Sequence, residues 1–224
     1  MAHNTPTATD AAVQADQIRT VYSQSLAIFA VSPLTATIVA AVLWPSSDRR
    51  LLTTWVTTMT IVIIVRAVLR RRYLRAQPST EETATWARRL VWGAFVTGLL
   101  WGLGGAVFYD PRALVPQLVL VFAIGGMVAG ASGTLAMHLP AFVAFAASTI
   151  LPVVVRMFAE GDVPHIAMGG LGIVYGLAMW LVASNSHFAV TEALRLRFEN
   201  RELLEQLTDA CKHAAAEVQA LALR

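Results

Sequence analysis

The stretch LVWGAFVTGLLWGLGGAVFY, residues 90–109, runs for twenty residues without one charged side chain. An α-helix rises about 1.5 Å per residue, and the hydrocarbon core of a bilayer is about 30 Å thick, so this stretch has the length of a membrane-crossing helix. Arg88 and Arg89 precede it and Asp110 follows it, which marks both of its ends. Residues 90–109 are therefore predicted to form a transmembrane helix.

Five further stretches share this length and apolar character: 25–44, 51–69, 115–137, 139–158 and 166–188. Apolar residues make up 56% of the 224, and charged residues only 14%, whereas a soluble domain carries about a quarter charged residues. We therefore predict an all-α integral membrane protein of six transmembrane helices. Residues 1–24 are predicted to be a cytoplasmic N-terminal segment, 25–188 the transmembrane domain, and 189–224 a cytoplasmic helix.

Arginines set the predicted orientation. The longest interior loop, 70–89, contains Arg70, Arg71, Arg72, Arg75, Arg88 and Arg89. Short loops rich in arginine stay in the cytoplasm, so this loop is predicted to be inside. By alternation both chain ends and the turn at His138 are also inside, an N-in/C-in topology. Arg49 and Arg50, in a predicted outside turn, are outnumbered six to two.

The remaining composition excludes several classes of function. The net charge of +3 does not indicate nucleic-acid binding, because most of the arginines flank hydrophobic blocks. Cys211 is the single cysteine, so an intrachain disulfide is excluded. The chain contains no phosphate-binding loop, zinc motif or nucleophile elbow. We expect no metal, no cofactor and no catalytic residue in these 224 residues.

Glycine pairs four residues apart occur in three of the predicted spans: Gly98 with Gly102, Gly126 with Gly130, and Gly172 with Gly176. This spacing lets helix backbones approach closely in lipid, so spans three, four and six are predicted to form the packed interior. The alternative is that the missing side chains leave a gap for a ligand.

Charged residues are nearly absent from the predicted spans. Arg66 and Arg156 each lie near one end of a span and are interpreted as interfacial anchors that snorkel. No Asp or Glu lies inside any span, which argues against a proton-coupled transporter or an ion-selective pore.

A ligand site is predicted from the few polar and aromatic groups of the interior. An outside ligand would enter a cleft between helices, because the outside turns are too short to form a folded domain. The site is placed between spans three and six, and a membrane-soluble or amphipathic molecule fits such a cleft best. The predicted ligand residues are Trp101, Tyr175, Asn185 and His138.

The tail carries a heptad pattern. Apolar or small residues recur at spacings of three and four, which is the seam of a coiled coil. The seam predicts a parallel homodimer. No helix-stop signal precedes Arg224, so we expect the helix to continue into an output domain. The seam consists of Leu204, Leu207, Cys211, Ala214, Val218 and Leu221.

The stretch LRLRFENRELLEQL, residues 194–207, follows the last span directly. It resembles the connector that joins the polytopic membrane sensor domain of bacterial sensor histidine kinases, or of diguanylate cyclases, to a cytoplasmic output domain. The resemblance is strongest over residues 189–210 and extends loosely to the six-span layout. It implies location in the bacterial inner membrane, and it carries over no catalytic residue.

The sequence thus predicts the membrane sensor and dimerisation module of a bacterial signal-transduction receptor, favouring a histidine kinase over a diguanylate cyclase. A small-molecule transporter or channel subunit is the second class, and a membrane enzyme without a recognisable polar cluster is the third.

The predicted topology can be tested by cysteine accessibility in a Cys211→Ser background. Cysteines introduced by Ser79→Cys and Thr208→Cys should be shielded from an impermeant thiol reagent in whole cells, whereas Ser47→Cys should react. Labelling at position 79 but not at position 47 would reverse the orientation.

Overall fold

The computed structural model describes residues 8–24, 26–79 and 82–222, and all regular structure in this part of the chain is helical. The prediction of an all-α fold is confirmed there. The elements are α1 (Ala8–Gln24), α2 (Leu26–Leu43), α3 (Arg49–Ala76), α4 (Thr83–Val107), α5 (Leu114–Thr134), the short 3-10 helix η2 (Ala136–His138), α6 (Leu139–Glu160) and α7 (Val163–Ala222).

Five of these helices, α3 to α7, are long and apolar enough to cross a membrane. They indicate a multi-pass membrane protein. Helix α2 coincides with the first predicted span, but its described apolar part, Phe29–Leu43, is shorter than the roughly 20 residues that usually cross a bilayer.

The predicted loop 70–89 is wrong in its extent, because helix α3 continues through the first group of arginines to Ala76. Helix α4 begins at Thr83, so the second group also lies on a helix. Asp48 starts α3 by accepting hydrogen bonds from the backbone of Arg50 (2.7 Å) and Leu51 (3.2 Å). Arg75 lies in the last turn of α3, where the helix dipole favours a positive charge.

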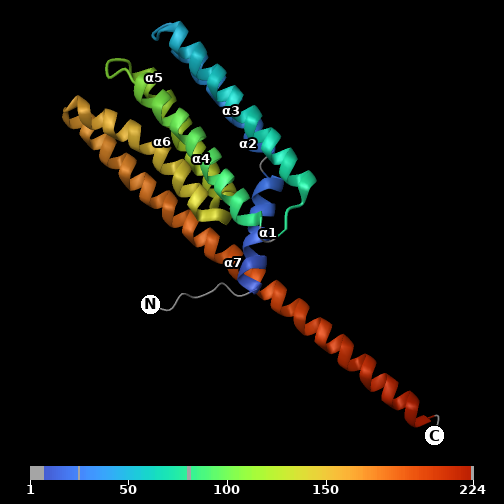
Figure 1. Ribbon diagram of the computed structural model, residues 1–224. Helices are drawn as coiled ribbons and strands as arrows, with labels where there is room; N and C mark the ends of the chain where they lie inside the picture. The colour runs from blue at the N-terminus through green and yellow to red at the C-terminus, as the bar shows by residue number, and fades with distance from the viewer. Residues whose placement is uncertain (1–7, 25, 80–81, 223–224) are drawn as a thin grey trace.

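Helix α6 lies between α4 and α7 and packs against both (Figure 1). The close contact with α4 depends on Gly98 and Gly102, where an added methyl group would overlap the backbone of α6 at Phe145 and Ser148. Thr149 on α6 is fully buried and donates a hydrogen bond to the Gly98 carbonyl oxygen (3.2 Å). The prediction that this glycine pair mediates close packing is confirmed.

The glycine pair of helix α5 behaves differently. A methyl group added at Gly126 or Gly130 would have no neighbour within 4 Å. The prediction that this pair packs the interior is therefore wrong, because no helix in the described part of the chain covers that face of α5 closely enough to need a glycine. The glycine pair in α7 meets side chains of α6 and not its backbone. An added methyl group would lie 2.9 Å from Val154 at Gly172 and 3.3 Å from Ile150 at Gly176.

Helix α7 runs without interruption for 60 residues, from the membrane bundle into the tail. Its first half packs against α5, α6 and η2, and its second half projects away from the bundle (Figure 1). The boundary predicted at residue 189 is thus not a break in the backbone.

Helix α1 docks on the bundle at the point where α7 leaves it (Figure 1). It buries Ile18, Val21 and Tyr22, although the N-terminal segment is polar in composition. Arg70 of α3 donates hydrogen bonds to the carbonyl oxygens of Tyr22 (2.8 Å) and Ser23 (3.0 Å), which satisfies free carbonyl groups at the end of α1.

The α4–α6 contact predicts unequal costs for two glycine substitutions. Gly98→Ala should destabilise the bundle by about 1–3 kcal/mol, because the methyl group has no space against α6. Gly133→Ala is the matched control, since nothing lies within 4 Å of its added methyl group. Thermal unfolding in one mild detergent should show a lower midpoint for the first variant alone, and equal midpoints would contradict the close contact.

Candidate functional site

A cavity of about 170 Å³ lies between α2, α3, α4, α5 and α6. Gly126 and Gly130 of α5 form one wall, because their missing side chains leave the space open. The rim is open between α2 and α5, where Val31 is half exposed and both glycines are exposed. The remaining lining residues are Arg66, Thr97, Met127, Ala131, Thr134, Leu135 and Phe145. The lining is mostly apolar, with one charged group.

That charged group is Arg66. It does not snorkel toward the basic end of the bundle, which is the end that carries Arg70, Arg71, Arg72, Arg75, Arg88 and Arg89. Its Nη1 donates a hydrogen bond to Thr97 Oγ1 (2.9 Å), and its Nε would lie 3.3 Å from a methyl group at Gly93. Gly93 and Thr97 lie four and eight residues beyond Arg89, which places them roughly 6 and 12 Å further along α4. The guanidinium therefore points away from the basic end, and the interfacial-anchor interpretation is wrong.

A second, smaller cavity of about 20 Å³ shares Arg66 and Leu135 with the first. Its opposite wall contains Tyr22 of α1 and Arg89 of α4. Arg66 thus stands between the larger cavity and the docking surface of α1. The guanidinium also lies over the ring of Phe29, 5.8 Å from its centre, a geometry that stabilises a cation.

Tyr22 fixes α1 to the bundle through an aromatic cluster. Its ring stacks on Tyr73 at 4.2 Å and meets Trp86 edge-on at 6.1 Å. Burial raises the pKa of the Tyr22 hydroxyl to about 12, so this group stays protonated at neutral pH. It donates a hydrogen bond to the Trp86 carbonyl oxygen (3.3 Å). At the other end of this surface, Gln17 donates to Thr191 Oγ1 on α7 (2.8 Å).

None of the four predicted ligand residues lines either cavity. Trp101 is fully buried, donates its indole N–H to Ser32 Oγ (3.2 Å), and meets Trp55 edge-on at 5.5 Å. These contacts make Trp101 part of the packed core. The proposed cleft between spans three and six does not form beside it, because α6 lies between α4 and α7.

The other three predicted residues lie apart from Trp101. Tyr175 donates its hydroxyl to the Gly125 carbonyl oxygen, which joins α7 to α5. Asn185 is exposed on α7, and His138 is buried in η2. Near η2, His187 Nδ1 lies 3.0 Å from the Ala136 carbonyl oxygen, so this histidine ties α7 to the turn.

The tail residues of the predicted seam are uncovered. Leu204 and Leu207 are each more than 60% exposed, and Cys211 is exposed. These three lie on an apolar stripe that no other part of the described chain contacts. The side chains of Ala214, Val218 and Leu221 lie outside the described residues.

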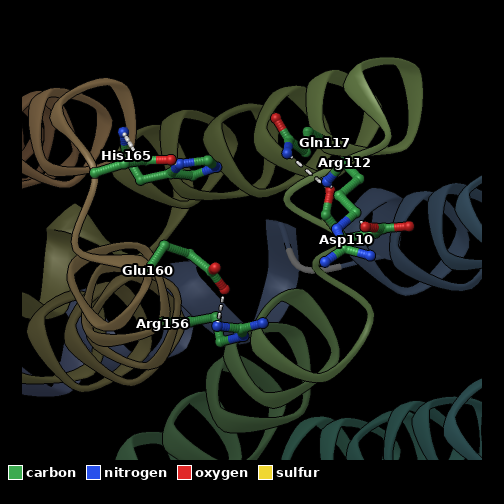
Figure 2. Close-up of polar contacts among 7 residues, drawn as sticks. Asp110, Arg112, Gln117, Arg156, Glu160 and His165 are labelled. Atoms are coloured by element: carbon green, nitrogen blue, oxygen red, sulfur yellow. Dashed lines mark hydrogen bonds and ion pairs between the residues drawn. The ribbon is translucent and has the colours of Figure 1, made fainter.

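Polar residues gather around the α4–α5 and α6–α7 turns, at the end of the bundle opposite the tail (Figure 1). Figure 2 shows their contacts. Arg156 pairs with Glu160, and His165 pairs with Asp162. A backbone hydrogen bond from His165, together with one from its side chain, lowers the pKa of the Asp162 carboxyl. Gln117 donates to the Asp110 carbonyl oxygen (2.7 Å). Both ion pairs join residues three or four positions apart, so they stabilise the ends of α6 and α7 locally.

Sequence reasoning missed Gly126, Gly130, Thr97 and Arg66 as members of one site. Two features of the sequence point toward this site. Arg66 is one of two arginines within the predicted spans, and the alternative interpretation of the glycine pairs is a gap for a ligand. What the sequence lacked was the direction of the arginine side chain and the neighbour of each glycine.

Comparison of this chain with protein-family models, with curated proteins and with solved structures finds no match.

Proposed function

We propose that this chain is the membrane sensor and dimerisation module of a bacterial signal-transduction receptor of the histidine-kinase class. In this proposal α2 crosses the membrane together with α3 to α7, which gives six spans. The basic end of the bundle faces the cytoplasm, and the module lies in the inner membrane. A small amphipathic molecule enters the cavity from the bilayer. The chain itself carries no catalytic step and relays the signal to a cytoplasmic output domain.

The observation that carries this proposal is the continuity of helix α7. The same helix, Val163–Ala222, forms part of the membrane bundle and the described tail without a break. A rotation or translation of its membrane half is therefore transmitted to the tail with little loss, because the backbone hydrogen bonds of a helix resist bending. The tail resembles the connector of sensor kinases, which supports the same assignment.

Helix α1 supplies the route from the cavity to the tail. Tyr22 of α1 lines the smaller cavity, and Arg66 lines both cavities. Helix α1 touches α7 through the hydrogen bond of Gln17 with Thr191. A ligand that moves Arg66 would change the support of α1, and α1 would pass the change to α7 at the point where the tail begins.

The output requires two tails in contact. Both tails leave the same face of the membrane, so they pair in parallel. Leu204 and Leu207 are exposed in the single chain, which leaves their apolar surface free for a partner. Each fully buried leucine contributes about 2 kcal/mol, so this short seam is weak by itself. Confinement of both chains to one bilayer raises their effective concentration and favours the dimer.

The parallel tail dimer can be tested through Cys211. In membranes under mild oxidation the chain should form a disulfide-linked dimer, because Cys211 lies on the seam. Leu207→Lys should reduce this cross-link several-fold by placing two charges in the seam. Gln206→Lys adds the same charge at a neighbouring exposed position off the seam and should leave the cross-link nearly unchanged. Absence of any Cys211 cross-link in membranes would contradict the parallel seam.

The sensor function can be tested by filling the cavity. Gly130→Leu places a side chain in the cavity, whereas Gly133→Leu places the same side chain at an exposed position of α5 that does not line it. We expect the rate of Cys211 cross-linking in membranes to change at least twofold in the first variant and to stay at the wild-type value in the second.

Equal rates in wild-type, Gly130→Leu and Gly133→Leu chains would contradict coupling between the cavity and the tail. Circular dichroism and gel filtration in mild detergent would establish that both variants are folded.

A further inference from the structure

Arg66 carries a charge inside the bundle without an acidic partner among the described residues. A guanidinium has five N–H donors, and here one hydrogen bond, to Thr97, is formed within the described chain. No Asp or Glu lies in any predicted span. Since an unpaired charge away from water is costly, the site favours any anion that reaches it.

The cavity next to this charge is suited to hydrocarbon. Its volume is about 170 Å³. An engineered apolar cavity of about 150 Å³ in another protein binds benzene, so this cavity has room for a small hydrocarbon group. Met127, Ala131, Leu135 and Phe145 are among its apolar lining residues. The rim between α2 and α5 is open, since Val31, Gly126 and Gly130 are exposed there, so a longer chain can extend out of the cavity past these residues.

We propose that the cavity binds an amphipathic anion whose oxyanion head accepts hydrogen bonds from Arg66 and whose hydrocarbon body lies against Gly126 and Gly130. The inference rests on the proposed sensor function and specifies the ligand class for the same cavity. The planar guanidinium matches the two oxygens of a carboxylate or of a phosphate. Two sources supply this chemistry: a free aliphatic carboxylic acid, and the headgroup of an anionic phospholipid.

The direction of Arg66 distinguishes this arrangement from an ordinary basic flank. Arginines that meet headgroups at a membrane surface extend toward that surface. Arg66 extends the opposite way, toward Thr97, and is held there by the Thr97 hydroxyl and the ring of Phe29. Those two neighbours orient the guanidinium without neutralising it, which leaves its charge available to a ligand at the cavity wall.

The test uses the full chain in nanodiscs of neutral phosphatidylcholine, with radiolabelled octanoate as the probe and empty nanodiscs as the background. Octanoate should bind saturably, and octanol at equal concentration should not displace it, because the alcohol lacks the charge. Arg66→Gln should weaken octanoate binding roughly ten- to a hundredfold, the loss expected for hydrogen bonds to a charged group. Arg156→Gln, which removes an arginine from α6 outside the cavity, should leave binding unchanged.

A second pair of variants separates the cavity from the charge. Gly130→Leu should weaken octanoate binding by a similar factor while retaining Arg66, and Gly133→Leu should bind as the wild type does. Adding phosphatidylglycerol to the nanodiscs identifies the source. Strong competition by this lipid assigns the cavity to a phospholipid headgroup, and lack of competition assigns it to a free carboxylic acid. Both results support the amphipathic anion.

Two results would overturn the inference. The first is that octanol competes as well as unlabelled octanoate does. The second is that Arg66→Gln binds octanoate with wild-type affinity. Either result would leave the proposed sensor function standing if Gly130→Leu still changes the Cys211 cross-linking rate, because that experiment requires no anion.

Discussion

The close approach of α4 to α6 is the contact on which the arrangement of the bundle depends. Without water to drive association, helices in lipid are held by packing and by short hydrogen bonds, and both require the backbones to be near one another. Gly98 and Gly102 allow the two backbones to approach closely. Thr149 stabilises the contact by donating a hydrogen bond to the Gly98 carbonyl oxygen. Helix α7 packs on the other side of α6 from α4, and also contacts α5 and η2 (Figure 1).

The cavity lies beside this contact, since Phe145 of α6, which meets α4 at Gly98, also lines the cavity. Helix α5 brings a glycine pair with the same spacing, but no helix backbone covers Gly126 and Gly130. The absent side chains therefore leave volume instead of permitting contact. Thr97 of α4 lines this volume and accepts a hydrogen bond from Arg66, so three consecutive helices, α3, α4 and α5, bring a charge and an apolar space together.

The helical character and most helix positions follow from the sequence, because a run of about twenty apolar residues has few stable structures in lipid other than a helix. The tail as a continuous helix also follows from its heptad spacing. The candidate site does not follow. Identical glycine spacings in α4 and α5 have opposite outcomes, since the outcome depends on which helix lies opposite. The direction of Arg66 does not follow, because position along a helix does not determine where a long side chain points. The hydroxyl partner of the buried Trp101, Ser32, also depends on which helix lies opposite.

In the proposed relay, helix α1 is the element that couples the cavity to the tail. A ligand shifts an equilibrium only by the difference in its affinity for two states, so the proposed relay needs an element with two arrangements of similar free energy. The α4–α6 contact is a poor candidate, because its closely packed backbones tolerate little movement. The docking of α1 is a better one. It depends on a few aromatic contacts of Tyr22 and on hydrogen bonds from Arg70 and Gln17, each of which contributes about 1 kcal/mol or somewhat more. Couplings between sites are typically about 1–3 kcal/mol, so the loss or gain of one or two of these contacts is of the size that a sensor needs.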